Sequence, residues 1–261
     1  MTHTTFDMPE AFAEILIVAI VIAVTVALHA IWQRRFRSEL LRKHNDVAGF
    51  LFSAVGVIYA VVLGFVVVVV WEKYDTTVSN VETEIAAVSD LYRTVGGFSD
   101  PTRTLVRREL VTYTNGMIDT EWPEMANGMV IPKDLVLLET LAHQVDTYLP
   151  RTSGEADAQQ MAMTQLERLF DARRLRLIQS APSVPLVLWF ALVAGALAML
   201  AFAFLFGVEN RGAQLVMTAI LAGLIAILFI VISEFDEPFN GSVHISDNGW
   251  IALQQHLSQI P

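Results

Sequence analysis

Four long uncharged stretches limit what this chain can fold into. They are Ile15–Trp32, Val47–Trp71, Val184–Val208 and Ala213–Ile232, and none contains a Lys, Arg, Asp or Glu. Each has about the twenty residues that an α-helix needs to cross the hydrocarbon core of a bilayer. A helix also satisfies its own backbone hydrogen bonds, which lipid cannot do. The sequence therefore predicts an all-α polytopic membrane protein with four transmembrane helices.

The remaining composition excludes several kinds of chemistry. The chain contains no cysteine, so disulfides and thiolate metal sites are excluded. Its net charge of -10 argues against nucleic acid as a partner, because nucleic acids select basic surfaces. The histidines are scattered, and no catalytic motif occurs. We therefore expect no enzyme activity, no cofactor and no metal site, and we expect the lipid bilayer as a partner.

The distribution of basic residues predicts an orientation. The short segment Arg34–Lys43 joins the first two uncharged stretches and carries five basic residues, namely Arg34, Arg35, Arg37, Arg42 and Lys43. Short loops rich in Lys and Arg face the cytoplasm. The N-terminus, residues 73–183 and the C-terminus are then expected on the outer side of a bacterial inner membrane. The basic segment Asp171–Leu177 opposes this, but long segments translocate largely regardless of charge.

Apolar residues continue beyond the second stretch at steps of four and three residues. They are Tyr74, Val78, Val81, Ile85, Val88, Tyr92 and Val95. This heptad pattern predicts that the second membrane helix extends out of the bilayer as far as Gly96–Gly97. Asp100 and Pro101 then mark the start of a further helix. The segment has more acidic than basic residues, so an acidic, all-helical extramembrane domain is expected between membrane helices two and three.

These features divide the chain into four parts. Residues 1–72 form the N-terminal tail and membrane helices one and two, and residues 73–183 form the helical domain. Residues 184–233 form membrane helices three and four. Residues 234–261 form a C-terminal tail with an acidic motif and an amphipathic segment. In that segment Trp250, Ile251, Leu253 and Leu257 are expected on one side of a short helix lying on the membrane surface.

Two sets of residues are candidates for function. Small residues, Gly56, Ala60 and Gly64, recur every four positions in the second stretch, which ends in the bulky run Val66–Trp71. Small residues let membrane helices approach closely, and bulky apolar side chains around an axis can gate ions by dewetting. The same residues are also explained by packing of this helix against other helices of its own chain or against lipid. Both interpretations stay open.

The second set is acidic and follows the fourth stretch. Glu234, Asp236 and Glu237 lie just before Pro238. They can simply end a helix at the membrane surface. Alternatively, repeated around an oligomer, they form a ring that binds or selects cations. We keep these three residues as ion-binding or selectivity candidates.

Four separated blocks carry a resemblance to a known family. They are GVIYAVVLGFVVVVVWEKYD (Gly56–Asp75), EIAAVSDLYR (Glu84–Arg93), TEWPEM (Thr120–Met125) and EFDEPFNGSVHIS (Glu234–Ser246). In this order they resemble the bacterial bestrophin-like domain family. Bestrophins are pentameric ion channels with four membrane helices per subunit, and their second helix lines a hydrophobic neck.

This resemblance implies an oligomeric channel whose neck lies around Ala60, Gly64 and Val67. Together with the small residues and the bulky run of the second uncharged stretch, this gives five pore-lining candidates: Gly56, Ala60, Gly64, Val67 and Trp71. Bestrophins also bind calcium through an acidic cluster after their last membrane segment. The spacing of the acidic residues here differs, so calcium binding is not carried over. Bestrophins keep their extramembrane helices and termini in the cytosol, opposite to what the basic loop predicts.

The sequence thus leads to two functional hypotheses. The first is a homo-oligomeric ion channel, with five copies implied by the resemblance and cations favoured by the net acidity. The second is a non-conducting membrane sensor or scaffold. In that case the heptad residues Tyr74–Val95 would bind a partner protein, and no water path would follow the second helix.

Overall fold

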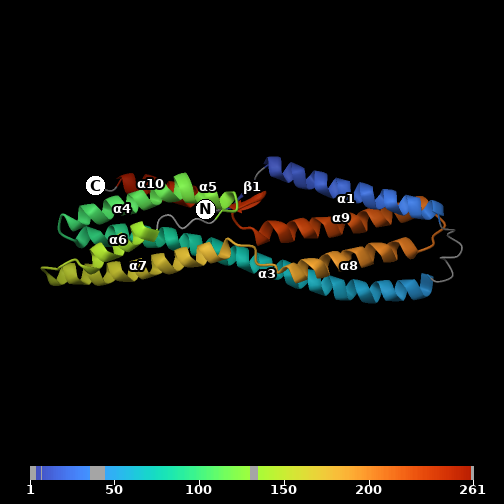
Figure 1. Ribbon diagram of the computed structural model, residues 1–261, viewed down its shortest axis with the longest axis horizontal. Helices are drawn as coiled ribbons and strands as arrows, with labels where there is room; N and C mark the ends of the chain where they lie inside the picture. Colours follow the sequence, from blue (N-terminus) through green and yellow to red (C-terminus); the bar gives the residue numbers. More distant parts are fainter. Residues whose placement is uncertain (1–3, 7, 36–44, 130–134, 260–261) are drawn as a thin grey trace. The chain divides into compact units, whose positions relative to one another are not determined.

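The computed structural model describes residues 4–6, 8–35, 45–129 and 135–259, with the elements labelled in Figure 1. The basic residues Arg37, Arg42 and Lys43 lie outside the described residues. The chain divides into two compact units. The spanning unit comprises residues 7–72 and 183–236, and the helical unit comprises residues 1–6, 73–182 and 237–261.

The spanning unit contains four long apolar helices. They are α1 (Met8–Arg35), the first part of α3 (Asn45–Thr94), α8 (Leu186–Leu205) and α9 (Arg211–Asp236). All four are long and apolar enough to cross a membrane, which confirms the predicted all-α fold with four membrane helices. Helices α1 and α9 pack along each other, and α8 also contacts α9 (Figure 1).

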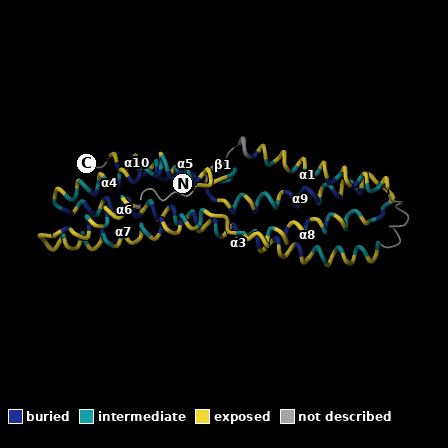
Figure 2. Tube along the Cα trace, in the orientation of Figure 1, coloured by how far each residue is buried: buried dark blue, intermediate teal, exposed yellow. Residues whose placement is uncertain are grey.

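The core of the spanning unit joins α3 to α8 and α9. Tyr59, Leu63 and Val66 of α3 are buried in a cluster with residues of α8 and α9. The Tyr59 hydroxyl donates a hydrogen bond to the backbone oxygen of Leu192 over 3.1 Å. The Tyr59 ring lies so close to Gly195 that an added methyl group would collide with it. The outer sides of these helices are largely exposed (Figure 2), as expected where lipid or another protein covers them.

A buried polar cluster also links α1 to α9. The side chain of His29 is fully buried, and its Nδ1 lies 2.8 Å from the Thr218 hydroxyl oxygen. Gln33 donates a hydrogen bond to Gln214 over 2.9 Å. Hydrogen bonds between side chains of neighbouring helices stabilise their association in membranes. His29 therefore contributes to helix packing in this structure.

The helical unit is built from the rest of α3 and several shorter elements. These are η1 (Val95–Gly97), α4 (Thr102–Gly116), the π-helix η2 (Met117–Glu121), α5 (Trp122–Ala126), α6 (Leu135–Asp146), α7 (Ser153–Gln179) and α10 (Asn248–Gln259). Two short strands, β1 (Thr4–Phe6) and β2 (Val243–Ile245), pair antiparallel, with Thr4 opposite Ile245. The strands bring the two ends of the chain together within this unit.

The heptad residues form the core side of α3 in the helical unit. Tyr74, Val81, Val88, Tyr92 and Val95 are buried, and the other two residues of the pattern are half-buried. The predicted continuation of the second membrane helix is confirmed, since α3 runs to Thr94 and ends in η1. Because this face is used inside the unit, it is not free to bind a partner protein in the way the second hypothesis requires.

The amphipathic segment near the C-terminus differs from its prediction. It forms α10 as a helix, but α10 packs against α4 and η2 of the helical unit. Trp250, Leu253 and Leu257 are buried there, and Ile251 is half-buried. The placement on the membrane surface was wrong, because the protein's own helices already cover the apolar side. Residues 237–261 are thus part of the helical unit instead of a separate tail.

Candidate functional site

Helix α3 presents a broad uncharged face that no other described helix of the spanning unit covers. Opposite its buried side, the exposed fractions are 66% for Val57, 48% for Val68 and 54% for Trp71. Ala60 and Gly64 are exposed on the same side. A methyl group added at Gly64 would meet no atom within 4 Å. This face is therefore open to lipid or to another copy of the chain.

The five pore-lining candidates fall into two groups. Ala60, Gly64 and Trp71 lie on the open face. Gly56 packs against α8, since an added methyl group there would lie 3.3 Å from Cε of Met199. Val67 is partly buried and packs against the core cluster of the spanning unit.

Carboxylates follow along the same helix in the helical unit. Asp75 and Glu82 are exposed and seven residues apart, so they lie on one side of α3, away from its buried face. Val57 and Asp75 are separated by 75 − 57 = 18 residues, which is about five helical turns. Gly64 and Glu82 have the same separation, 82 − 64 = 18. Each unit thus leaves one side of its own part of α3 exposed, apolar in the spanning unit and acidic in the helical unit.

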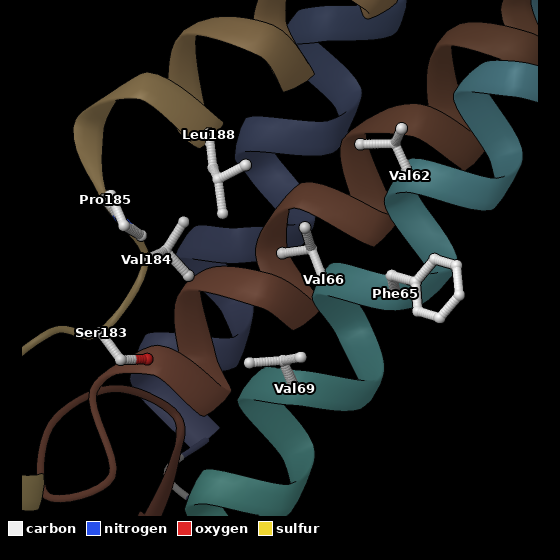
Figure 3. A pocket seen from close by; sticks show the side chains of 8 residues that line it. All are labelled: Val62, Phe65, Val66, Val69, Ser183, Val184, Pro185 and Leu188. Atoms are coloured by element: carbon white, nitrogen blue, oxygen red, sulfur yellow. The ribbon is translucent and has the colours of Figure 1, made fainter.

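A pocket of about 320 Å³ lies beside the other edge of α3. Figure 3 shows Val66 and Val69 of α3 facing Val184 and Leu188 near the start of α8. The lining is apolar apart from Ser183, whose hydroxyl already donates to Asp236 over 2.8 Å. The pocket offers hydrophobic contact and no group for ion binding or catalysis.

The acidic motif is split by the fold. Asp236 is buried, and its Oδ1 accepts hydrogen bonds from the backbone nitrogens of Ser183 over 2.7 Å and Val184 over 3.2 Å. Asp236 thereby ties the end of α9 to the segment that begins α8. Glu234 is half-buried in the spanning unit, whereas Glu237 is exposed in the helical unit. Asp236 therefore has a structural task that does not need a bound ion.

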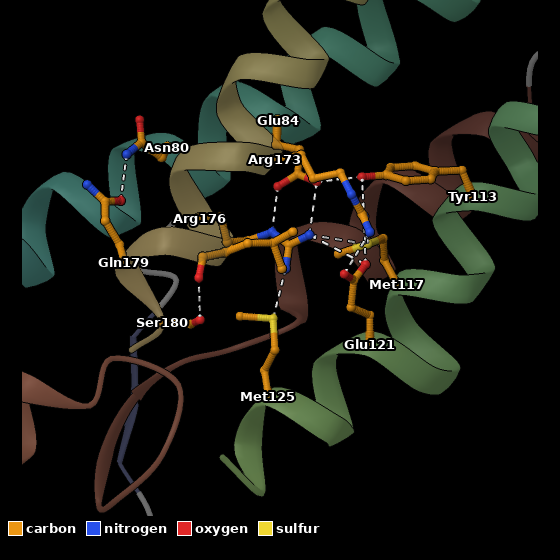
Figure 4. A network of polar contacts seen from close by, with 11 residues as sticks. Asn80, Glu84, Tyr113, Met117, Glu121, Met125, Arg173, Arg176, Gln179 and Ser180 are labelled. Atoms are coloured by element: carbon orange, nitrogen blue, oxygen red, sulfur yellow. Dashed lines mark hydrogen bonds and ion pairs between the residues drawn. The ribbon is translucent and has the colours of Figure 1, made fainter. Parts of the chain in front are cut away.

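A buried network of four charged side chains holds the helical unit together (Figure 4). Arg176 of α7 donates from Nε to Glu84 of α3 over 2.6 Å. Arg173 donates from Nη1 and Nη2 to the two carboxylate oxygens of Glu121 over 2.7 and 2.9 Å. Tyr113 of α4 donates to Glu84 over 2.5 Å and accepts from Arg173 over 3.1 Å. The network thus joins α3, α4, η2 and α7.

Burial sets the electrostatics of this network. For Arg176, burial alone would lower the pKa, but the charges of Glu84 and Glu121 and the hydrogen bond from Arg176 to Glu84 raise its pKa. For Tyr113, burial and the neighbouring charge of Glu84 raise the pKa well above its usual value. Arg173 and Arg176 therefore stay charged and Tyr113 stays neutral. Two positive and two negative charges compensate each other inside the unit.

Metal binding finds no support within the parts of the chain that the structure describes. There, no three His, Asp or Glu side chains come together in a way that could hold a metal ion.

A comparison with protein families decides where this chain belongs. A family model described as the bestrophin-like domain matches residues 17–249, which is most of the chain. The chain belongs to the bestrophin-like domain family. The resemblance predicted from the four sequence blocks is thereby confirmed, and the four apolar helices make this bestrophin-like chain a membrane protein.

Solved structures show the same fold. A bacterial bestrophin homologue from Klebsiella pneumoniae, solved by zinc phasing, superposes with a TM-score of 0.69 at 13% identity. The match covers 94% of the bestrophin-like chain and 100% of the homologue. A variant of the Klebsiella pneumoniae protein with isoleucine replaced by threonine gives a TM-score of 0.68 at 12% identity, covering 93% and 99%. No curated protein sequence matches the chain.

The buried network is the part of this bestrophin-like fold that sequence reasoning missed. Glu84 and Glu121 lie in two of the blocks that carry the family resemblance, and Arg173 and Arg176 lie in the basic segment Asp171–Leu177. One signal was present in the sequence. Glu84 falls between Val81 and Val88 on the buried face of α3, where a lone carboxylate needs a positively charged partner. The sequence did not indicate which arginine supplies it.

Proposed function

We propose that this chain assembles as a homo-oligomeric ion channel in the bacterial inner membrane, with α3 around the pore. The single observation that carries the proposal is the open side of α3, which is uncharged and includes small residues at Ala60 and Gly64. Ala60, Gly64 and Trp71 line the pore in this proposal. Gly56 and Val67 flank it while packing against the chain's own helices. Membership of the bestrophin-like family supports several copies, with five as the proposed number.

We propose further that the channel favours cations. Asp75 and Glu82 lie on one exposed side of α3, so each copy in an oligomer adds both carboxylates. Rings of carboxylates attract cations and repel anions. Glu234 and Glu237 remain candidates for a second acidic ring. Asp236 is a weaker candidate for ion binding because backbone and hydroxyl groups already occupy its carboxylate.

The proposed orientation keeps the N-terminus, the helical unit and the C-terminus outside. The loop that carries Arg34 and Arg35 supports this through its positive charge. In the sequence, the basic segment Asp171–Leu177 argues against this orientation, because its positive charge would lie outside. Two of its arginines, Arg173 and Arg176, neutralise buried carboxylates, which gives them a role independent of topology.

Planar-bilayer recordings test conduction. Purified full-length protein should give single-channel currents, and Gly64→Leu should reduce the conductance, because a bulky side chain then enters the passage from a position where an added Cβ meets no atom of its own chain within 4 Å. Silent bilayers, together with a monomer by light scattering, would instead support the sensor or scaffold hypothesis and overturn the channel.

Reversal potentials test selectivity. Asp75→Asn combined with Glu82→Gln should lower the preference for potassium over chloride. Glu167→Gln is the matched control, because Glu167 is an exposed carboxylate on a different helix, α7. Equal reversal potentials for all three proteins would remove Asp75 and Glu82 from the selectivity mechanism.

A further inference from the structure

One groove of the spanning unit combines an apolar lining with a carboxylate. It lies between α1 and α9 and has a volume of about 440 Å³. Ile15, Val18 and Ile22 line it from α1, and Ile227 and Ile230 line it from α9. Among the described residues that line it, Glu14 is the only ionisable one. The groove is thus hydrophobic along its length and negatively charged at one end.

The position of Glu14 matches the surface of a membrane. The uncharged stretch Ile15–Trp32 of α1 begins directly after Glu14, so Glu14 lies at the end of the apolar part of this helix. Because about twenty apolar residues span the hydrocarbon core, we infer that lipid headgroups lie near the depth of Glu14. From Glu14 to Ile22 the groove follows α1 for 22 − 14 = 8 residues, or about 12 Å toward the bilayer interior. An amphiphile with its headgroup at Glu14 therefore has room for part of an acyl chain.

The charge of Glu14 is not compensated from within the described part of the spanning unit. There, no described side chain forms a hydrogen bond or ion pair with the Glu14 carboxylate. The described Lys and Arg residues of this unit are Arg34, Arg35 and Arg211. Arg34 is 34 − 14 = 20 residues along α1 from Glu14, about 30 Å away. A half-buried carboxylate beside hydrocarbon is costly unless a positive group pairs with it.

We propose that this groove is a binding site for a phospholipid with an ethanolamine headgroup. The primary ammonium donates charge-assisted hydrogen bonds to the Glu14 carboxylate, and one acyl chain lies between α1 and α9. The phosphate, at the other end of the ethanolamine, stays in water. A choline headgroup has no N–H to donate, and a glycerol headgroup carries no positive charge. The site therefore selects ethanolamine over both. It does not depend on whether the protein conducts ions.

Native mass spectrometry of the full-length protein tests this site. The protein in detergent is offered equal amounts of dioleoyl phosphatidylethanolamine, phosphatidylcholine and phosphatidylglycerol. We expect about tenfold preferential retention of the ethanolamine lipid, as a hydrogen bond to a charged group provides. Glu14→Gln should abolish this preference. Glu72→Gln, an exposed acidic-to-amide change on α3, should leave it intact.

A second variant separates the groove from the carboxylate. Ala19 lines the groove and is exposed, so Ala19→Phe fills the space for the acyl chain and keeps Glu14. It should lower retention of the ethanolamine lipid several-fold. Equal retention of the three lipids by the unaltered protein, or an unchanged preference in Glu14→Gln, overturns the proposal. Binding of dodecylammonium without any preference for the ethanolamine lipid would assign the site to free amines and overturn it as well.

Discussion

At the scale of single residues, the buried pair of Glu84 and Arg176 shows how this protein treats charge away from water. Both side chains are fully buried, and each has charged partners on other helices. Removing two charges from water costs free energy that their attraction only partly returns, so such pairs seldom add stability over apolar residues. Once one member is present, however, the other is required. Glu84 and Arg176 therefore act on stability as a unit.

Glu84→Gln should strongly destabilise the helical unit. It removes one buried negative charge and leaves Arg176 incompletely compensated, which typically costs about 3–5 kcal/mol. Thermal unfolding of the detergent-solubilised protein measures this. Arg174→Gln is the control, because Arg174 is an exposed neighbour paired with Asp171 on the surface of α7. The free energy of unfolding of Arg174→Gln should differ from that of the unaltered protein by less than about 1 kcal/mol. Similar losses in both variants would contradict a special role for the buried network.

The stability contributed by Tyr113 should depend on pH. Burial and Glu84 raise its pKa above the usual value of 10.0. Below pH 10 the phenol is protonated in both folded and unfolded states. Above it, the unfolded state loses the proton while the folded state keeps it, so the free energy of unfolding falls as pH rises. The slope is at most about 1.4 kcal/mol per pH unit for one proton.

Unfolding midpoints measured between pH 8 and 11 detect this effect. The unaltered protein should lose stability above pH 10 more steeply than Tyr113→Phe, which has no phenol to ionise. Tyr113→Phe is less stable at neutral pH because Glu84 and Arg173 lose a hydrogen-bond partner. The difference between the two proteins should therefore narrow above pH 10. A constant difference would show that Tyr113 ionises equally in both states.

At the scale of elements, α3 serves different purposes on its two sides. Its buried side meets α8 and α9 in the spanning unit and the core of the helical unit. The opposite side is apolar at Val57 and Val68 and acidic at Asp75 and Glu82. A helix that only supports its own subunit does not need small residues on its open side. Polar residues where it meets water and apolar residues of any size where it meets lipid would be enough. The small residues Ala60 and Gly64 on its open side are what favour contact with other copies.

Substitutions at two glycines test this difference between the buried and the open side of α3. Gly195→Ala places a methyl group against the Tyr59 ring, so α3 and α8 must move apart, at a cost of about 1–3 kcal/mol. Gly64→Ala meets no atom of its own chain and should shift the free energy of unfolding by less than about 1 kcal/mol. Thermal unfolding of both variants in detergent compares them. A larger loss for Gly64→Ala would show that Gly64 makes a close contact after all, as in a tight seam between copies.

At the scale of the whole molecule, the ends of the chain return to one unit. The strand pair β1–β2 and the packing of α10 place residues 4–6 and 237–259 with the helices between α3 and α7. An even number of membrane helices allows this, because both termini and the segment between helices two and three then lie on the same side of the membrane. The arrangement is the same for either orientation, so the direction of insertion needs its own measurement.

Single cysteines determine that direction, since the native chain has none. A cysteine at Ser153, which is exposed at the start of α7, should react in intact cells with a thiol reagent that does not cross membranes. Asn210→Cys, at the exposed turn before α9, should react only after the membrane is permeabilised. The reverse pattern would place the helical unit in the cytoplasm, as in bestrophins, and overturn the orientation drawn from the basic loop.

Much of the architecture was predictable because it follows from local patterns. Lipid excludes charge, so the uncharged stretches identify the membrane helices, and the heptad spacing from Tyr74 to Val95 identifies the buried side of α3. The placement of Trp250 could not be predicted in this way. An amphipathic helix has the same pattern whether lipid or protein covers it, and only the neighbouring α4 and η2 decide. The same holds for Asp236, whose hydrogen-bond partners Ser183 and Val184 lie 53 and 52 residues away in sequence.

The sequence by itself determined the number of membrane helices, the length of α3 and the family, since hydrocarbon and helical periodicity act on neighbouring residues. Only the tertiary structure decided which charges are paired inside and which sides of the helices remain open. Arg173 and Arg176 belong to a basic segment in the sequence, and only the fold pairs them with Glu121 and Glu84. Glu14 lies just before an uncharged stretch in the sequence, and only the tertiary structure places it in a groove that α9 completes. Pairing and enclosure depend on segments distant in sequence, and no local pattern records them.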